Sequence, residues 1–148
     1  MTNIERARKL IERVRDAGVV DFCVCAGSRN SPLIVVLANS APLSFVDERS
    51  AAFFALGRTK QGHGCAVVTT SGTAVAELLP AVVEAHYSAL PLVLITADRP
   101  ARFRGSGAPQ AIEQSGIFGP YASTSIDGWN RKTPLHLNIE FDEPLIDE

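Results

Sequence analysis

Residues 65–96, CAVVTTSGTAVAELLPAVVEAHYSALPLVLIT, carry the pattern that decides the fold. Cys65 to Thr70 is a short apolar run, which favours a strand buried on both faces. Thr73 to Tyr87 follows as a long predicted helix, and Leu92 to Thr96 is a second apolar strand. A strand, a helix and a strand in this order are typical of a crossover between parallel strands.

The same alternation extends in both directions along the chain. Further strands are predicted at 22–25, 43–46 and 135–139, and further helices at 32–39 and 48–61. A first helix begins after Thr2, whose spacing from Glu5 matches a capping box, and Gly18 is a plausible stop.

Residues 97–120 hold four Gly and three Pro, so we expect a long loop with one helical turn near 111–114. The prediction is one α/β domain over residues 1–148, built as a three-layer, open, mostly parallel sheet with helices on both faces.

The composition excludes several classes of protein. The chain has 148 residues and a net charge of -2, so a nucleic-acid partner is not expected. It has no apolar run near the roughly 18 residues that a membrane span needs, and its start does not resemble a signal peptide. We therefore expect a cytoplasmic protein without a membrane span.

Cysteine and histidine residues show no metal-ligand spacing, so no metal ligand is predicted. The cysteines are expected to be buried free thiols, with Cys23 and Cys25 on opposite faces of their strand. The histidines are expected to be ordinary surface or core residues.

Polar residues follow four predicted strands at the point where each strand ends. These segments are 26–31, 47–49, 71–73 and 97–100, and each carries glycine, hydroxyl or charged side chains. Ligands bind outside the carboxyl ends of the strands in open parallel sheets. The sequence therefore predicts a binding site at this edge, without naming a reaction.

Single residues in these segments leave alternatives open. Ser28 is either a helix-capping hydroxyl or a ligand contact. Glu48 is either an acid that the helix dipole favours in a first turn or a catalytic group. Gly72 and Thr73 offer amide groups to an anion at a helix start, but lack the dinucleotide and P-loop signatures.

Three arginines crowd into residues 99–104 with no acid among them. They form either a solvated loop or an anion site.

Taken together, the segments resemble one family. Residues 25–33 are similar to its Gly-Ser-Arg-x-Ser/Thr-Pro-Leu signature, and 47–57 to its Asp-Glu-Arg…Ala-Leu-Gly segment. Residues 69–85, 96–100 and 107–114 match three further motifs in order. The family is that of the 2-succinyl-5-enolpyruvyl-6-hydroxy-3-cyclohexene-1-carboxylate synthases, thiamine-diphosphate enzymes of menaquinone biosynthesis. Ala26 and Pro109 depart from its common residues.

The resemblance implies a transferase that decarboxylates 2-oxoglutarate and adds the succinyl semialdehyde unit to isochorismate. This chain would be its N-terminal pyrimidine-binding domain. Glu48 would be catalytic and would bind thiamine diphosphate with Ser71, Gly72 and Thr73. Contacts to the substrates would come from Ser28, Arg29, Arg99 and Gln110.

The resemblance also implies partners that this chain does not contain. Mg²⁺ or Mn²⁺ would be bound through a diphosphate-binding domain of a neighbouring subunit in a homodimer or tetramer. The central and diphosphate-binding domains of the family are not within 1–148, so this chain alone is expected to be inactive. Two alternatives stay open: the pyrimidine domain of another thiamine-diphosphate decarboxylase or carboligase, or a non-catalytic assembly domain.

Overall fold

A single five-stranded sheet forms the centre of the molecule in the computed structural model, which describes residues 1–146. All pairings are parallel and the strand order is β2-β1-β3-β4-β5. The strands are β1 (Asp21–Cys25), β2 (Leu43–Phe45), β3 (Cys65–Thr69), β4 (Val93–Asp98) and β5 (Leu135–Glu140). The predicted fold class is confirmed.

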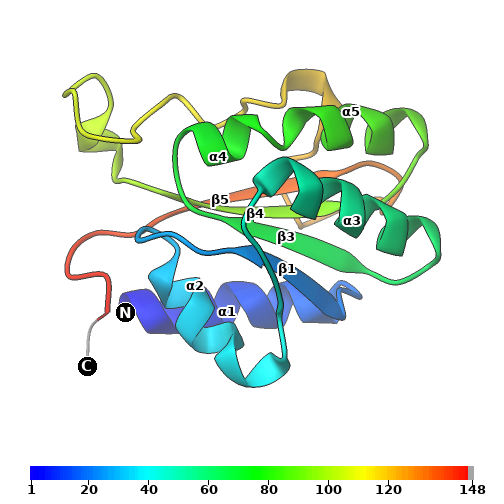
Figure 1. Cartoon of the computed structure of the whole chain (residues 1–148), viewed down its shortest axis with the longest axis horizontal. Coiled ribbons are helices and arrows are strands. Elements are labelled where there is room, and N and C mark those ends of the chain that lie inside the picture. Colours follow the sequence, from blue (N-terminus) through cyan, green and yellow to red (C-terminus); the bar gives the residue numbers. More distant parts are fainter. Residues whose placement is uncertain (147–148) are drawn as a thin grey trace.

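Helices cover both faces of this sheet, as Figure 1 shows. One face carries α1 (Asn3–Asp16) and α2 (Ser31–Leu37), and the other carries α3 (Glu48–Lys60), α4 (Thr73–Ala76) and α5 (Leu79–Tyr87). Three short 3₁₀ helices complete the described elements, at Ala38–Ser40, Ala101–Phe103 and Gly119–Tyr121.

The predicted capping box is present at the start of α1. The Thr2 hydroxyl accepts a hydrogen bond from the Glu5 amide, and the Glu5 carboxylate accepts one from the Thr2 amide. Ala7, Ile11 and Val14 then face the sheet at helical spacing and are fully buried.

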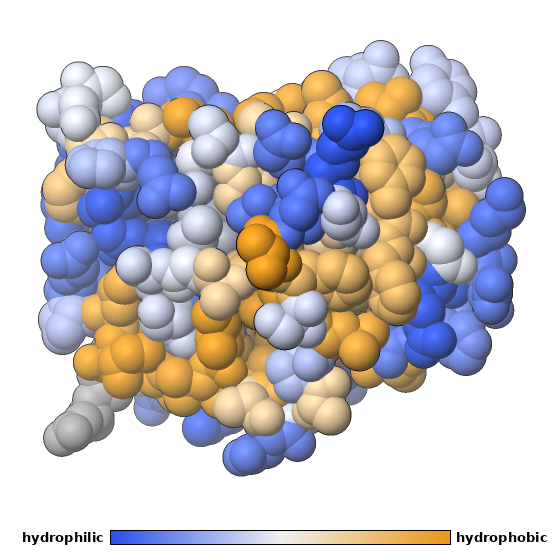
Figure 2. All heavy atoms as spheres, in the orientation of Figure 1, coloured by the Kyte–Doolittle hydropathy of each residue, from blue (hydrophilic) through white to orange (hydrophobic). Residues whose placement is uncertain are grey.

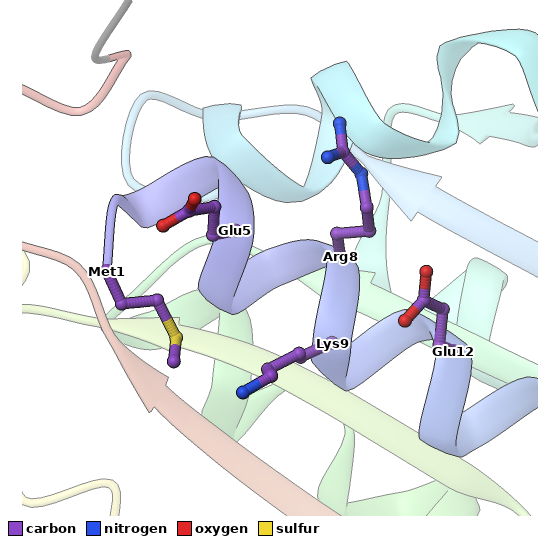
Figure 3. A pocket seen from close by; sticks show the side chains of 5 residues that line it. All are labelled: Met1, Glu5, Arg8, Lys9 and Glu12. Atoms are coloured by element: carbon purple, nitrogen blue, oxygen red, sulfur yellow. The ribbon is translucent and has the colours of Figure 1, made fainter.

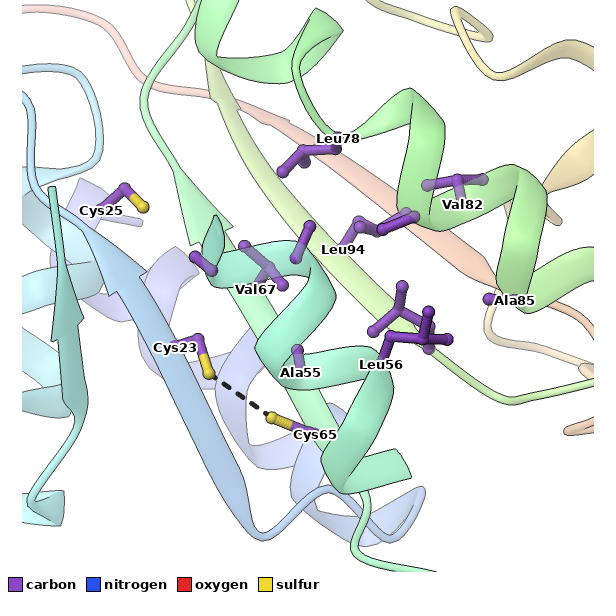
Figure 4. Packing of buried hydrophobic residues seen from close by; sticks show 14 of the residues in the cluster. Cys23, Cys25, Ala55, Leu56, Cys65, Val67, Leu78, Val82, Ala85 and Leu94 are labelled. Atoms are coloured by element: carbon purple, nitrogen blue, oxygen red, sulfur yellow. Dashed lines mark hydrogen bonds between the residues drawn. The ribbon is translucent and has the colours of Figure 1, made fainter. Parts of the chain in front are cut away.

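Two apolar clusters lie on opposite faces of the sheet. Val67, Leu94 and the three cysteines pack under α3 and α5 (Figure 4), whereas alternate strand residues such as Phe22 and Val68 pack under α1 and α2. Since residues two apart in a strand share a face, Cys23 and Cys25 lie on the same face, and the expectation of opposite faces is wrong. The cysteines are buried free thiols, as predicted.

The long helix predicted over 73–87 is broken into α4 and α5. Pro80 lacks an amide hydrogen, and its ring would clash with the carbonyl of Ala76 in a continuous helix. A new helix therefore starts with Pro80 in its first turn.

The helical turn predicted near 111–114 is absent. Gln110 has a positive φ of 53°, and the Gln114 side chain is fully buried against the ends of the strands, which holds the segment in an irregular path.

No helix within the described residues is long and apolar enough to cross a membrane.

Candidate active site at the carboxyl edge of the sheet

The strand order creates a switch point between β1 and β3. The chain leaves β1 toward α2 on one face of the sheet and leaves β3 toward α4 on the other (Figure 1). Ligands of open α/β sheets bind in the crevice that such a reversal opens. Two loops approach closely here, because a Cβ added to Gly27 would lie 2.5 Å from Cβ of Thr70. This point is the centre of the candidate site.

Asn30, not Ser28, holds the turn between β1 and α2. The Asn30 side chain accepts a hydrogen bond from the Gly27 amide at 2.9 Å and donates one to the Cys25 carbonyl at 2.9 Å. No side-chain hydrogen bond caps α2. The capping interpretation of Ser28 is therefore wrong, and its exposed hydroxyl is available to a ligand.

Glu48 opens α3, but Asp47 caps that helix by accepting a hydrogen bond from the Ser50 amide at 2.7 Å. The Glu48 carboxylate is half-buried and has neither a hydrogen bond nor an ion pair with any described residue. Burial and then the Glu48 charge raise the pKa of the Cys25 thiol to about 12. The Glu48 charge therefore influences Cys25 at the carboxyl end of β1, while its oxygens have no partner in the part of the chain that the structure describes.

The turn after β3 depends on Gly72. Its φ of 82° is unfavourable for other residues, and an added Cβ would lie 2.9 Å from Cβ of Gln110. The Gly72 amide donates to Oε1 of Gln114 at 3.1 Å. This amide is therefore not free for an anion, which corrects that part of the sequence-based expectation.

Arg29 and Arg99 both reach the segment that follows β5. Arg29 is buried, and its two terminal nitrogens donate to the Phe141 carbonyl and to Oε1 of Glu143, each at 3.0 Å. Nη1 of Arg99 lies 3.9 Å from the same Glu143 oxygen, while its Nε donates to the Pro109 carbonyl at 3.0 Å.

Gln110 extends this chain of contacts to the Gly72 turn. Its side-chain amide donates to the Ser71 carbonyl at 3.4 Å. The structure thus links Arg29, Arg99, Gln110, Ser71 and Gly72 in one continuous series. Glu48, Ser28 and Thr73 have no side-chain hydrogen bond to that series among the described residues.

The other two arginines of the cluster are neutralised within the chain. Arg102 makes two hydrogen bonds to the Asp142 carboxylate, at 2.6 and 2.7 Å. Arg104 donates to Asp98 at 3.0 Å and to Glu140 at 2.9 Å. The solvated-loop interpretation fits Arg102, which is exposed, whereas Arg104 is largely buried. Intramolecular carboxylates pair with both residues, so the anion-site interpretation describes neither.

A polar network that was not predicted from the sequence lies beside the candidate site. The Thr96 hydroxyl donates to Oδ1 of Asn138 at 2.7 Å and lies 2.7 Å from Nε2 of His136. Gln114 also donates to Asn138 Oδ1, and the Asn138 amide donates to Asp98. Burial lowers the pKa of His136 to about 4.

One sequence signal for this network existed. His136, Asn138 and Glu140 alternate with apolar residues in β5, so their side chains share one face.

A separate surface hollow of about 320 Å³ lies along α1 (Figure 3). Its lining consists of Met1, Glu5, Arg8, Lys9 and Glu12. Four of these residues lie in α1, and none is a predicted site residue, so the hollow does not define the site.

Comparison with known proteins gives the class of this domain. Residues 4–117 match the family model of the thiamine pyrophosphate enzyme, N-terminal TPP binding domain, and the chain belongs to that family.

Similar proteins that the comparison found carry the name of one enzyme within this family. A protein of Bdellovibrio bacteriovorus is 51% identical, with 99% of this chain covered, and one of Akkermansia muciniphila is 52% identical, with 86% covered. A third, from a Nocardioides species, is 45% identical over 95% of the chain. Each is named 2-succinyl-5-enolpyruvyl-6-hydroxy-3-cyclohexene-1-carboxylate synthase, which confirms the resemblance inferred from the motifs. The chain spans 31%, 27% and 28% of the length of these relatives.

Proposed function

We propose that this chain is the pyrimidine-binding domain of a thiamine-diphosphate-dependent synthase. The whole protein would decarboxylate 2-oxoglutarate and join the remaining four-carbon unit to isochorismate, in menaquinone biosynthesis in the cytoplasm. The observation that carries the proposal is the half-buried Glu48 at the carboxyl edge of the sheet, whose carboxylate has no partner within residues 1–146.

Glu48 fits the cofactor's requirements. Thiamine diphosphate, when bound, supplies the electron sink that 2-oxo acid decarboxylation needs. The aminopyrimidine ring of the cofactor needs a carboxyl group that forms a hydrogen bond with ring nitrogen N1′ and transfers a proton along it. Glu48 has no competing partner among the described residues. The loop of Ser71, Gly72 and Thr73 would flank the same ring.

Ser28, Arg29, Arg99 and Gln110 would hold the substrates, which are dicarboxylates. Planar guanidinium groups grip carboxylates with paired hydrogen bonds. The convergence of Arg29 and Arg99 on one carboxylate oxygen of Glu143 supports this assignment, because it demonstrates that both reach a common point.

The remaining parts of the site would come from outside residues 1–148. A diphosphate-binding domain of a neighbouring subunit would hold Mg²⁺ or Mn²⁺ and would face Glu48 in a homo-oligomer. An exposed apolar surface beside Glu48 supports such a partner (Figure 2): Val46 is fully exposed, and Leu43, Phe53 and Phe54 are partly exposed. Reading the coding sequence past Glu148 for a Gly-Asp-Gly…Asn metal motif tests this part.

The test of the function is Glu48→Gln in the full-length protein. We expect turnover to fall by at least about 100-fold, the usual contribution of an acid–base group. Asp47→Asn is the matched control, since it removes the adjacent carboxylate and keeps a helix-capping side chain. Near-normal turnover of Glu48→Gln would contradict the proposal.

The reaction that the full-length protein catalyses distinguishes the proposed synthase from the two alternative functions. Decarboxylation of 2-oxoglutarate without addition to isochorismate would indicate another carboligase. A full-length protein that forms oligomers without thiamine diphosphate and turns over neither substrate would indicate a non-catalytic assembly domain.

A further inference from the structure

Glu143 places one carboxylate oxygen between two arginines from distant parts of the chain. Oε1 of Glu143 lies 3.0 Å from Nη2 of Arg29 and 3.9 Å from Nη1 of Arg99. Arg29 follows β1, Arg99 follows β4 and Glu143 follows β5. An intramolecular carboxylate therefore fills the point at which both guanidinium groups converge.

The three side chains differ in burial. The side chains of Arg29 and Arg99 are 6% and 21% exposed, whereas that of Glu143 is 69% exposed. Each guanidinium is fixed by a backbone carbonyl, Phe141 for Arg29 and Pro109 for Arg99. The two arginine side chains are therefore held in place, whereas the Glu143 carboxylate can rotate away from them toward the solvent.

The backbone around Glu143 is held without its carboxylate. Phe141 is fully buried, and the Asn3 side chain donates to the carbonyls of Asp142 and Pro144 at 2.7 and 3.0 Å. A change of the Glu143 rotamer alone would vacate the space between the arginines. Release of the carboxylate does not require movement of the segment.

We propose that Glu143 is an intramolecular competitor of the substrate, which occupies a carboxylate subsite formed by Arg29 and Arg99 until a ligand carboxylate replaces it. The proposal rests on the proposed function for the identity of the ligand, isochorismate. A tethered carboxylate competes with every anion, so the apparent affinity is reduced by the fraction of molecules in which it is bound.

The variant Glu143→Gln in the full-length protein tests the proposal, because it keeps the shape and removes the charge. We expect the KM for isochorismate to fall by about two- to fivefold, the range that an exposed ion pair supplies. The kcat is expected to be little changed. If Glu143 is only a structural clamp for Arg29, the KM rises instead. Asp142→Asn is the control, since it removes the neighbouring carboxylate, which pairs with Arg102.

Inorganic sulfate provides a readout that does not depend on activity. Thermal stabilisation by sulfate should be larger for Glu143→Gln than for the unsubstituted protein, and Glu143→Gln/Arg99→Gln should lose that gain. An unchanged or weaker response of Glu143→Gln would overturn the proposal, even in an active synthase. A stronger sulfate response in a protein without synthase activity would support the subsite and remove the proposed function.

Discussion

Oε1 of Gln114 accepts a hydrogen bond from the backbone amide of Gly72 at 3.1 Å, across 42 positions of the chain. The same side chain donates to the Ala97 carbonyl at 2.9 Å and to Asn138 Oδ1 at 2.7 Å. One buried amide therefore connects the turn after β3 with the ends of β4 and β5. Since Gly72 flanks the proposed cofactor position, Gln114 fixes the geometry of the site without being exposed to it.

Replacement of Gln114 should be costly for stability. Gln114→Ala leaves buried groups of Gly72, Ala97 and Asn138 without this partner, and such losses cost about 1–3 kcal/mol each before relaxation. We expect the free energy of unfolding of the full-length protein to fall by about 2–4 kcal/mol. Urea unfolding measures it, with the exposed Gln61→Ala as control. Equal effects of the two substitutions would contradict the prediction.

Two glycines should respond to alanine in opposite directions. Gly72→Ala meets both a φ of 82° and the Gln110 side chain, so we expect destabilisation of about 1–3 kcal/mol. Gly57 lies in α3, and outside the local helix backbone no described atom lies within 4 Å of an added Cβ, so Gly57→Ala should stabilise by about 0.5–1 kcal/mol. Thermal or urea unfolding of both variants tests this, and a stable Gly72→Ala protein would disprove the assigned constraint.

His136 should make stability depend on pH. Its folded pKa of about 4 lies below the ordinary 6.5, so the unfolded chain binds more protons between these values. The free energy of unfolding should therefore fall as the pH drops from 6.5 to 4, by at most about 1.4 kcal/mol per pH unit. Above pH 6.5 this contribution is fully present.

Unfolding by urea at pH 5 and pH 7 measures this effect. His136→Asn should be less stable at neutral pH and should show a flatter dependence in the same window. If His136→Asn keeps the full pH dependence of the free energy of unfolding, other titratable groups cause that dependence.

The cysteines should be unreactive in the folded protein. All three are buried, which shields their sulfur atoms from reagents, and burial together with the Glu48 charge raises the pKa of Cys25 to about 12. We expect a thiol reagent to label them only after denaturation. Ser28→Cys adds an exposed thiol as a positive control. Rapid labelling of the unsubstituted chain would show that the sheet opens.

Arg99→Ala should mainly weaken the handling of isochorismate. The lost guanidinium would bind a carboxylate, so we expect the KM for isochorismate to rise by about tenfold or more, as loss of a charged hydrogen bond predicts. Decarboxylation of 2-oxoglutarate alone should change less. Arg102→Ala is the control, because Arg102 pairs with Asp142 at an exposed position. An equal loss of both activities in Arg99→Ala would argue against its assignment.

Local patterns were sufficient for the five strands and most of the helices, and they placed polar residues directly after four of the strands. Apolar runs such as Cys65 to Thr70 identify buried strands because both faces of a parallel sheet are covered, and their alternation with helices requires parallel crossovers. Capping at Thr2 and Glu5 depends on residues only three apart, so it too was predictable. Pro80 could have predicted the break between α4 and α5, but the sequence on both sides of it is typical of one long helix.

The partners of the site residues depend on segments that are distant in the chain. Gln114 lies in a loop segment with no local sign of burial, yet it is enclosed by the ends of β3, β4 and β5. Glu143, 114 positions from Arg29, occupies the point that the sequence assigned to a ligand. Periodicity reports only neighbours within a few residues, whereas hydrogen bonds and ion pairs form between whichever groups the strand order brings together. The residue types of the proposed site can therefore be read from the chain, whereas their pairing with one another depends on the packing of the sheet.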